Sequence, residues 1–373
     1  MGFVMTQVSL FRRLLLPGFV FQSVVIAGGY GTGRELAEFF LSEGPLGGLL
    51  AMAVSTLLWS LVCVVTFEFA RVFQTFDYRS FFKELLGRGW WIYEAAYLVF
   101  MLIILAVIAA AAGSLLEETF GLPYWAGVLG IMAAVGILVL GGSRTIEKAM
   151  AGWSLVLYAA YIVLFLWCFQ RFGGDIRASF ASVDVGRGWG MAGVRYAAYN
   201  VALIPPLLFA VRHSQGRRDS VVAGLLTGPI AMIPGLLFFL SMAGEYPAVL
   251  DRPVPANHLL ELLGSRSFQI AFQIVLFGTL IETGTGLIHG MNERISRVYE
   301  ERGRSMPALL RSGLGVGLLL SGTLLASVGL VDLIARGYGT LTYVFLAVYV
   351  VPILTLGVFR LFRPPPGSVG AEE

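Results

Sequence analysis

The sequence predicts an all-α integral membrane protein with ten transmembrane helices, arranged as two halves of five spans in opposite orientation. Hydrophobic residues make up 57% of the 373 residues and charged residues only 13%, about half the share of charge in a soluble chain. Apolar runs of roughly 20 residues, long enough to cross a bilayer, recur along the whole chain. Helix-breaking residues interrupt the first and the sixth of these runs.

Each apolar run is expected to form one membrane-spanning helix. Proline opens three of these helices, at Pro45, Pro123 and Pro307, and glycine closes two, at Gly121 and Gly244. The expected spans are 14–41, 46–73, 90–115, 123–141, 148–170, 188–211, 220–243, 267–291, 307–329 and 338–361.

The positive charges indicate an orientation. If the N-terminus is cytoplasmic, most Lys and Arg residues fall in inner segments and the first two outer loops contain none, as the enrichment of positive charge in cytoplasmic loops requires. Both termini are therefore expected in the cytoplasm and the chain in the inner membrane. The net charge of +3 and the scattered arginines offer no basic face for nucleic acid.

Two connections are expected to contain short helices. Residues 79–88 alternate apolar and charged side chains, which suits a helix on the inner membrane surface. In the outer connection 244–266, Asn257 is expected to cap the N-terminus of a helix that ends at Gly264.

The first span contains Gly28, Gly29, Gly31 and Gly33 within six residues. Each glycine costs about 1 kcal/mol inside a helix, so an unwound stretch is expected. Irregular backbone persists at membrane depth only where protein or a wet cavity receives it. The alternative is that these glycines form a surface on which another helix packs.

The sixth span contains Pro205 and Pro206, with Asn200 upstream. The two prolines remove backbone donors and disfavour helical geometry before them; a simple kink is the alternative. Both interruptions fall in the first span of a half that holds five spans, and an odd number of spans inverts the second half. Residues 1–186 and 187–363 are therefore expected to be inverted repeats, followed by a disordered cytoplasmic tail, 364–373.

Three segments of the sequence resemble known membrane proteins: GGYGTGRELAEFF in the first span, YAAYN in the sixth and ETGTGLIHGMNERI in the eighth. They are similar to the YkvI-type bacterial membrane proteins, and the ten-span plan resembles the amino acid–polyamine–organocation superfamily with its LeuT-type fold. The resemblance implies secondary transport of a small amine-bearing solute by alternating access, often driven by sodium or protons. Spans 1, 2, 6 and 7 would form a bundle that moves against the rest. Motifs that define the substrate in the well-known branches have no match here.

A substrate site is expected at the two breaks, where backbone amides and carbonyls become available at the midplane. A zwitterion would place its carboxylate at the N-terminal end of the half-helix that starts near Arg34 and its ammonium near the carbonyls. The expected residues are Gly28, Gly29, Tyr30, Gly31, Thr32, Gly33, Tyr199 and Asn200.

The resemblance also implies a sodium site between the first half-helix and the eighth span. Hard oxygen ligands suit this cation. Carried over by position, the ligands are the carbonyls of Ala27, Gly28 and Tyr30 and the side chains of Thr279, Glu282 and Thr283. Two alternatives stay open: Glu282 carries a proton, or it pairs with a basic side chain while the threonines bond to their own helix.

Inserting a charged side chain at the bilayer centre costs at least about 2.5–3.5 kcal/mol, so each such residue is a candidate functional group. Arg34, Glu35 and Glu38 follow the first break, and His289 lies toward the inner end of the eighth span. They are expected to act as gate or coupling groups, with an internal ion pair and a satisfied interfacial histidine as the alternatives.

Enzymatic and channel functions have less support. The sequence contains no HExxH, and GGYGTGRE lacks the Lys-Ser/Thr of a phosphate-binding loop. A channel needs a continuous polar pore, whereas the polar residues here cluster between the two breaks. We therefore expect no enzyme activity and no cofactor or metal beyond a coupling Na⁺ or H⁺, and the expected partners are the solute and the bilayer.

Overall fold

The computed structural model describes residues 9–140, 153–181, 185–300 and 302–363. Within these residues the chain forms helices and no strand. Seven of the described helices are long and apolar enough to cross a membrane, and the bent pair Trp189–Leu203 and Pro205–His213 makes an eighth. The predicted all-α membrane protein is confirmed, while the count of ten spans and the inverted repeat stay predictions. The predicted tail, 364–373, lies outside the described residues.

The helices occupy the predicted spans, but three of them run well past the predicted ends: α9 reaches Ala181 instead of 170, α13 reaches Glu300 instead of 291, and the last span runs over Leu330–Phe362 instead of 338–361. Those of the first half are α1 (Leu16–Val25), α2 (Gly28–Gly31), α3 (Arg34–Phe39), α4 (Pro45–Val72), α5 (Tyr78–Leu86), α6 (Trp90–Phe120), α7 (Tyr124–Leu140) and α9 (Trp153–Ala181). Those of the second half are α10 (Trp189–Asn200), α11 (Arg217–Ala243), α12 (Pro255–Leu262), α13 (Arg266–Glu300), α14 (Ala308–Leu325), α15 (Leu330–Asp332), α16 (Gly339–Phe345) and α17 (Val358–Phe362).

Local sequence explains several of these boundaries. Gly121 ends α6 with φ of 65°, a left-handed conformation that glycine adopts without strain. Asp77 caps α5, because its carboxylate accepts the amides of Arg79 and Ser80 at 3.0 Å each. The short helix predicted at residues 79–88 is therefore present.

The prediction that Asn257 caps an outer helix is wrong. The helix α12 begins two residues earlier, at Pro255, with Val254 as its N-cap, because proline is pre-organised for the first helical turn. The Asn257 side chain instead accepts hydrogen bonds from Gln269 at 2.7 Å and from Gln273 at 3.0 Å. It therefore ties α12 to α13.

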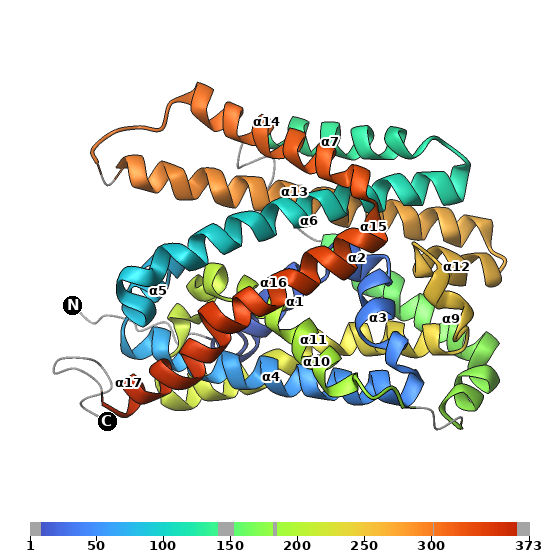
Figure 1. The fold of residues 1–373 in the computed structure, drawn as a ribbon, viewed down its shortest axis with the longest axis horizontal. Coiled ribbons are helices and arrows are strands. Elements are labelled where there is room, and N and C mark those ends of the chain that lie inside the picture. The colour runs from blue at the N-terminus through green and yellow to red at the C-terminus, as the bar shows by residue number, and fades with distance from the viewer. Residues whose placement is uncertain (1–8, 141–152, 182–184, 301, 364–373) are drawn as a thin grey trace.

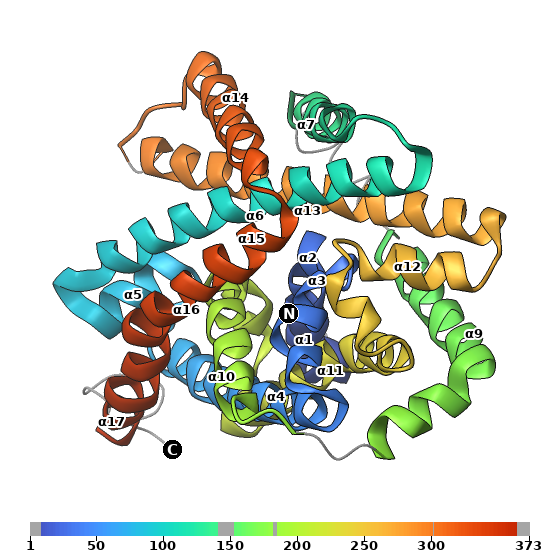
Figure 2. The same ribbon diagram turned by 45° about the vertical axis from the view of Figure 1, so that its right-hand side comes forward.

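The helices form two groups with the first span between them. In Figures 1 and 2, α4, α10 and α11 lie on one side and α6, α7, α13 and α14 on the other, and α1–α3 run between them. The first group, together with α1, contains the predicted spans 1, 2, 6 and 7, and these helices pack on one another.

Small residues allow α4 and α11 to approach closely. A Cβ atom on Gly224 would lie 2.5 Å from the Val64 Cα, and one on Gly228 would lie 2.4 Å from the Thr56 carbonyl oxygen. Glycines spaced by four residues form such contact faces in membrane helices. The close packing of these two helices favours their behaviour as one rigid unit.

Candidate functional site

The first span is interrupted where the glycine run predicts it. The helix α1 ends at Val25, Ala27 is extended with ψ of −163°, and the four-residue α2 follows. Gly33 then takes a φ of 82° before α3 begins at Arg34. A Cβ atom on Gly33 would also lie 2.8 Å from the Phe238 ring, so both the conformation and the space require glycine there.

Protein groups satisfy the irregular backbone of this break. The Gly31 carbonyl accepts the Tyr161 hydroxyl at 2.9 Å, and the Thr32 carbonyl accepts the Ala256 amide of α12 at 2.9 Å. The Thr32 hydroxyl donates to the Gly29 carbonyl at 3.1 Å. The break is therefore held by neighbouring helices, as backbone at membrane depth must be.

The sixth span is bent through 3₁₀ turns, whereas the first span contains extended backbone. The helix α10 ends at Asn200, a 3₁₀ turn covers Val201–Leu203, and a second 3₁₀ segment runs over Pro205–His213 at an angle of 68° to the first part. The Asn200 amide donates to the Tyr196 carbonyl at 3.0 Å. Both predicted interruptions are thus present, the first as an extended segment and the second as a bend.

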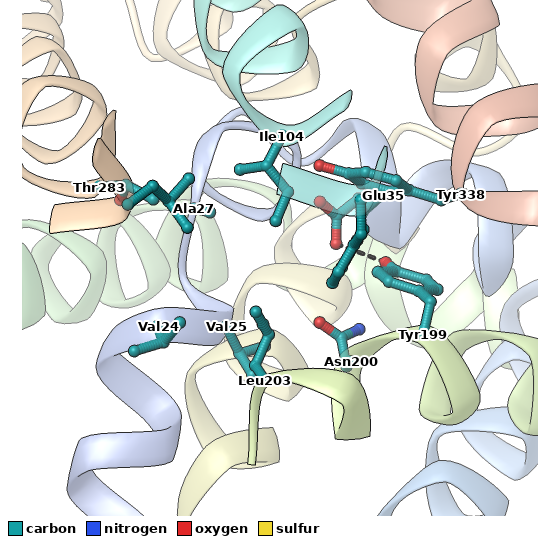
Figure 3. Close-up of a pocket in the computed structure, with 12 residues that line it drawn as sticks. Val24, Val25, Ala27, Glu35, Ile104, Tyr199, Asn200, Leu203, Thr283 and Tyr338 are labelled. Atoms are coloured by element: carbon teal, nitrogen blue, oxygen red, sulfur yellow. Dashed lines mark hydrogen bonds between the residues drawn. The ribbon is translucent and has the colours of Figure 1, made fainter. Parts of the chain in front are cut away.

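A cavity of about 20 Å³ lies between the two breaks (Figure 3). The first break, the sixth span, α6, α13 and the segment Leu333–Tyr338 contribute its walls. The lining residues are Val24, Val25, Ala27, Glu35, Phe100, Ile104, Tyr199, Asn200, Leu203, Thr283, Leu287 and Tyr338. Such a volume holds about one water molecule, so the cavity has to widen before it admits a solute.

Glu35 is the charged side chain of this cavity, and it is 2% exposed. Its Oε2 atom accepts the Tyr199 hydroxyl at 2.7 Å, and the backbone amide of Tyr30 lies near its carboxylate. In the part of the chain that the structure describes, no Arg, Lys or His forms an ion pair with it. The carboxylate therefore links the two broken helices through neutral donors.

Three aromatic rings line the cavity beside this carboxylate. The Tyr199 and Tyr338 rings stack with centroids 4.7 Å apart, and the Phe100 ring meets them at 6.1 and 5.8 Å. In Figure 3 the Tyr338 hydroxyl points to the side on which the Glu35 carboxylate lies. Of these rings only that of Tyr199 is expected from the sequence, because Phe100 lies within a long apolar run and Tyr338 at the start of a span that contains no predicted break.

The other predicted substrate residues surround the cavity without lining it. Gly28 packs against Leu280 and Ile108, where a Cβ atom would lie 3.1 and 3.3 Å from them. Tyr30 is fully buried, but its hydroxyl faces Gly235 of α11, where a Cβ atom would lie 2.6 Å away. Its side chain therefore braces the break against α11.

The predicted sodium ligands lie partly at the cavity. Ala27 and Thr283 line it, and Glu282 does not. The carbonyls of Ala27, Gly28 and Tyr30 each accept a backbone amide, at 2.7, 3.2 and 2.9 Å. The Thr279 and Thr283 hydroxyls donate to carbonyls one turn back, each at 3.0 Å, as the structural alternative expects, whereas none of the ion pairs among the described residues involves Glu282.

The remaining residues predicted as gate or coupling groups lie in different parts of the structure. Arg34 binds Glu38 at 2.9 Å and donates to the carbonyls of Leu250 and Arg252 at 2.6 and 3.1 Å, so it holds the start of α3 to the outer connection. His289 lies half-buried on α13 and does not line the cavity. Glu35 is thus the predicted gate residue that faces the cavity.

Comparisons of the sequence and of the structure with known proteins identify the fold. No protein-family model matches the chain. It is 23% identical over 321 residues to the uncharacterized membrane protein YkvI of Bacillus subtilis (strain 168), covering 81% of this chain and 88% of that protein.

Solved structures give a similar result. One is MhsT in complex with L-phenylalanine, with a TM-score of 0.61, 16% identity and coverage of 93% of this chain and 88% of that one. Another is a Na⁺-coupled sialic acid symporter, with a TM-score of 0.51, 12% identity and coverage of 94% and 92%. A variant of the manganese transporter of Eremococcus coleocola has a TM-score of 0.51, 15% identity and coverage of 99% and 91%. The chain is therefore an integral membrane protein with the LeuT-type fold of transporters, as the resemblance in its sequence implied.

Proposed function

We propose that this protein is a secondary active transporter that moves a small amine-bearing solute by alternating access. One observation carries the proposal: a buried cavity with a single carboxylate, Glu35, lies where two broken helices meet. Discontinuous helices around a midplane site are the usual architecture of such transporters. A cavity that holds about one water molecule also favours a transporter over a channel, which needs a continuous polar pore.

The transport cycle follows from how the cavity is built. Its walls come from two groups of helices, with α1 and the sixth span on one side and α6 and α13 on the other. Rocking of the first group against the second would widen the cavity toward each membrane face in turn. We propose residues 1–186 and 187–363 as the inverted repeats behind this motion, in the inner membrane with both termini cytoplasmic.

We propose Na⁺ as the coupling ion, at the site formed by Ala27, Thr283 and their predicted co-ligands. Hard oxygen atoms and the nearby end of α1 support a cation there, and the sialic acid symporter of similar fold is Na⁺-coupled. Proton coupling or uncoupled exchange is the second candidate. The hydrogen bonds already accepted by the break carbonyls favour it, because a proton needs only a carboxylate such as Glu35.

Transport by purified protein in proteoliposomes tests the proposal. Radiolabelled primary amines and amino acids are offered under a Na⁺ gradient, under a pH gradient and under no gradient. A transporter gives saturable uptake and counterflow, in which internal unlabelled solute accelerates entry of the label. Unsaturable flux without counterflow would identify a channel, and the gradient that drives accumulation identifies the coupling ion.

A further inference from the structure

The charge balance of the cavity indicates which solute it takes. Eleven of its twelve lining residues are neutral, and the remaining one is Glu35. A carboxylate that is 2% exposed loses most of its hydration, which is unfavourable unless a cation or several hydrogen bonds replace the water. Two neutral donors, Tyr199 and the Tyr30 amide, meet it. The site therefore offers one buried carboxyl group without a counter-ion among the described side chains, and a bound cation would stabilise its ionised form.

Glu35 belongs to the first turn of α3, the half-helix at whose N-terminal end a solute carboxylate is expected. It folds back over the break so closely that a Cβ atom on Gly29 would lie 2.2 Å from its Oε1 atom. The buried backbone amide of Tyr30 also lies near it. A zwitterion binding there would bring two carboxylates together, and like charges at such a distance repel strongly.

The remaining walls suit an ammonium group attached to an apolar body. Phe100, Tyr199 and Tyr338 line the same cavity as Glu35 and pack on one another, and aromatic faces attract cations, more so in a desolvated site. The Asn200 side chain, whose amide is bonded to its own helix, lies on the same side of the cavity (Figure 3). Val25, Leu203 and other aliphatic residues line the rest.

We propose that the site selects organic ammonium cations that lack a carboxylate, with the ammonium on Glu35 and the hydrocarbon part against the aliphatic wall. The proposal rests on the proposed transport function and names its substrate class. A solute carboxylate would find no cationic side chain in the cavity. Amino acids are consequently poor ligands, and the amines with the same side chains are good ones.

Matched ligand pairs test this on the purified full-length protein. Each pair differs only by the carboxylate: ethylamine with alanine, isobutylamine with valine, 3-methylbutylamine with leucine, and phenethylamine with phenylalanine. Leucinamide, which keeps the carbonyl without the charge, completes the set. Binding is measured as the rise in melting temperature with ligand concentration, in potassium chloride and in sodium chloride. The variants are Glu35→Gln and, as a matched control, Glu293→Gln on the half-exposed pair with Arg311.

In the wild type we expect at least one amine to bind about tenfold or more tightly than its amino acid, with leucinamide closer to the amine. In Glu35→Gln the affinity for the amine should fall by about thirty-fold or more, which corresponds to the loss of one buried charge pair. The affinity of Glu293→Gln should match that of the wild type. The ligand comparison in the wild type stands even if Glu35→Gln fails to fold.

Tighter binding of the amino acids would overturn the substrate class and leave the transporter proposal intact. Equal amine binding by Glu35→Gln and the wild type would overturn the role of Glu35. Stabilisation by sodium chloride that needs Glu35, with no response to any amine, would identify an inorganic cation site instead. Amine binding without counterflow in proteoliposomes would contradict the transport function and leave the amine site standing.

Discussion

Replacing Gly29 by alanine should disable the site through Glu35, while the same change two residues later should not. A Cβ atom at position 29 would lie 2.2 Å from the Glu35 Oε1 atom and 2.8 Å from its Cδ atom, so the carboxylate has to leave its place. At Gly31 the nearest atom is the Leu276 Cδ2 at 3.3 Å, a tight contact that a flexible side chain relieves. The two variants therefore share their chemistry and differ in what the new methyl group meets.

The expected magnitudes follow from the bonds that each change affects. Displacing Glu35 breaks its hydrogen bond to Tyr199, and a bond to a charged group contributes about 1.5–3 kcal/mol. Alanine in place of glycine in a helix gains about 1 kcal/mol. Gly29→Ala should thus destabilise the protein by about 0.5–2 kcal/mol, and Gly31→Ala should be neutral or slightly stabilising. The cavity of about 20 Å³ offers the displaced carboxylate little room to find other donors.

Melting temperature and amine affinity, measured on both variants beside the wild type, check this reasoning. We expect Gly29→Ala to lose at least tenfold in affinity for the tightest-binding amine of the matched series and Gly31→Ala to stay within about threefold, the difference reflecting one displaced charge. Gly29→Val and Gly31→Val, which add more bulk at the break, should both abolish binding while the protein still inserts. Equal affinities and equal melting temperatures in the two alanine variants would refute the placement of Glu35 against Gly29.

Three further changes probe separate parts of the molecule. Tyr199→Phe removes the hydroxyl bonded to Glu35, so a loss of about 1.5–3 kcal/mol in unfolding free energy is expected, and an unchanged denaturation midpoint would contradict that bond. Glu282→Gln should raise the sodium concentration required for half-maximal uptake if the predicted ion site exists; uptake with unaltered dependence on both sodium and pH would make Glu282 a structural residue. Arg34→Gln removes the donor to two carbonyls of the outer connection, so proteinase K should cut residues 244–254 faster, and an unchanged cleavage rate would show that other contacts hold this segment.

The sequence determined the membrane class and the location of both breaks. Apolar runs of bilayer length, the glycines from Gly28 to Gly33 and the pair Pro205–Pro206 act through local backbone chemistry, which needs no knowledge of neighbours. Glu35 could be singled out for the same reason, since a charge at membrane depth requires an explanation wherever it points. These inferences agree with the broken helices and with the cavity between them.

Only the tertiary structure decided which polar groups face one another. Thr283 lines the cavity and Glu282 does not, because of how α13 is rotated against its neighbours. The Arg34 guanidinium donates to backbone carbonyls of residues more than two hundred positions away. Phe100 and Tyr338 line the cavity of Glu35 from helices whose sequence patterns mark no site. Helix rotation and long-range contacts arise from packing between spans, and the sequence of a single span does not specify which residues of other spans it contacts.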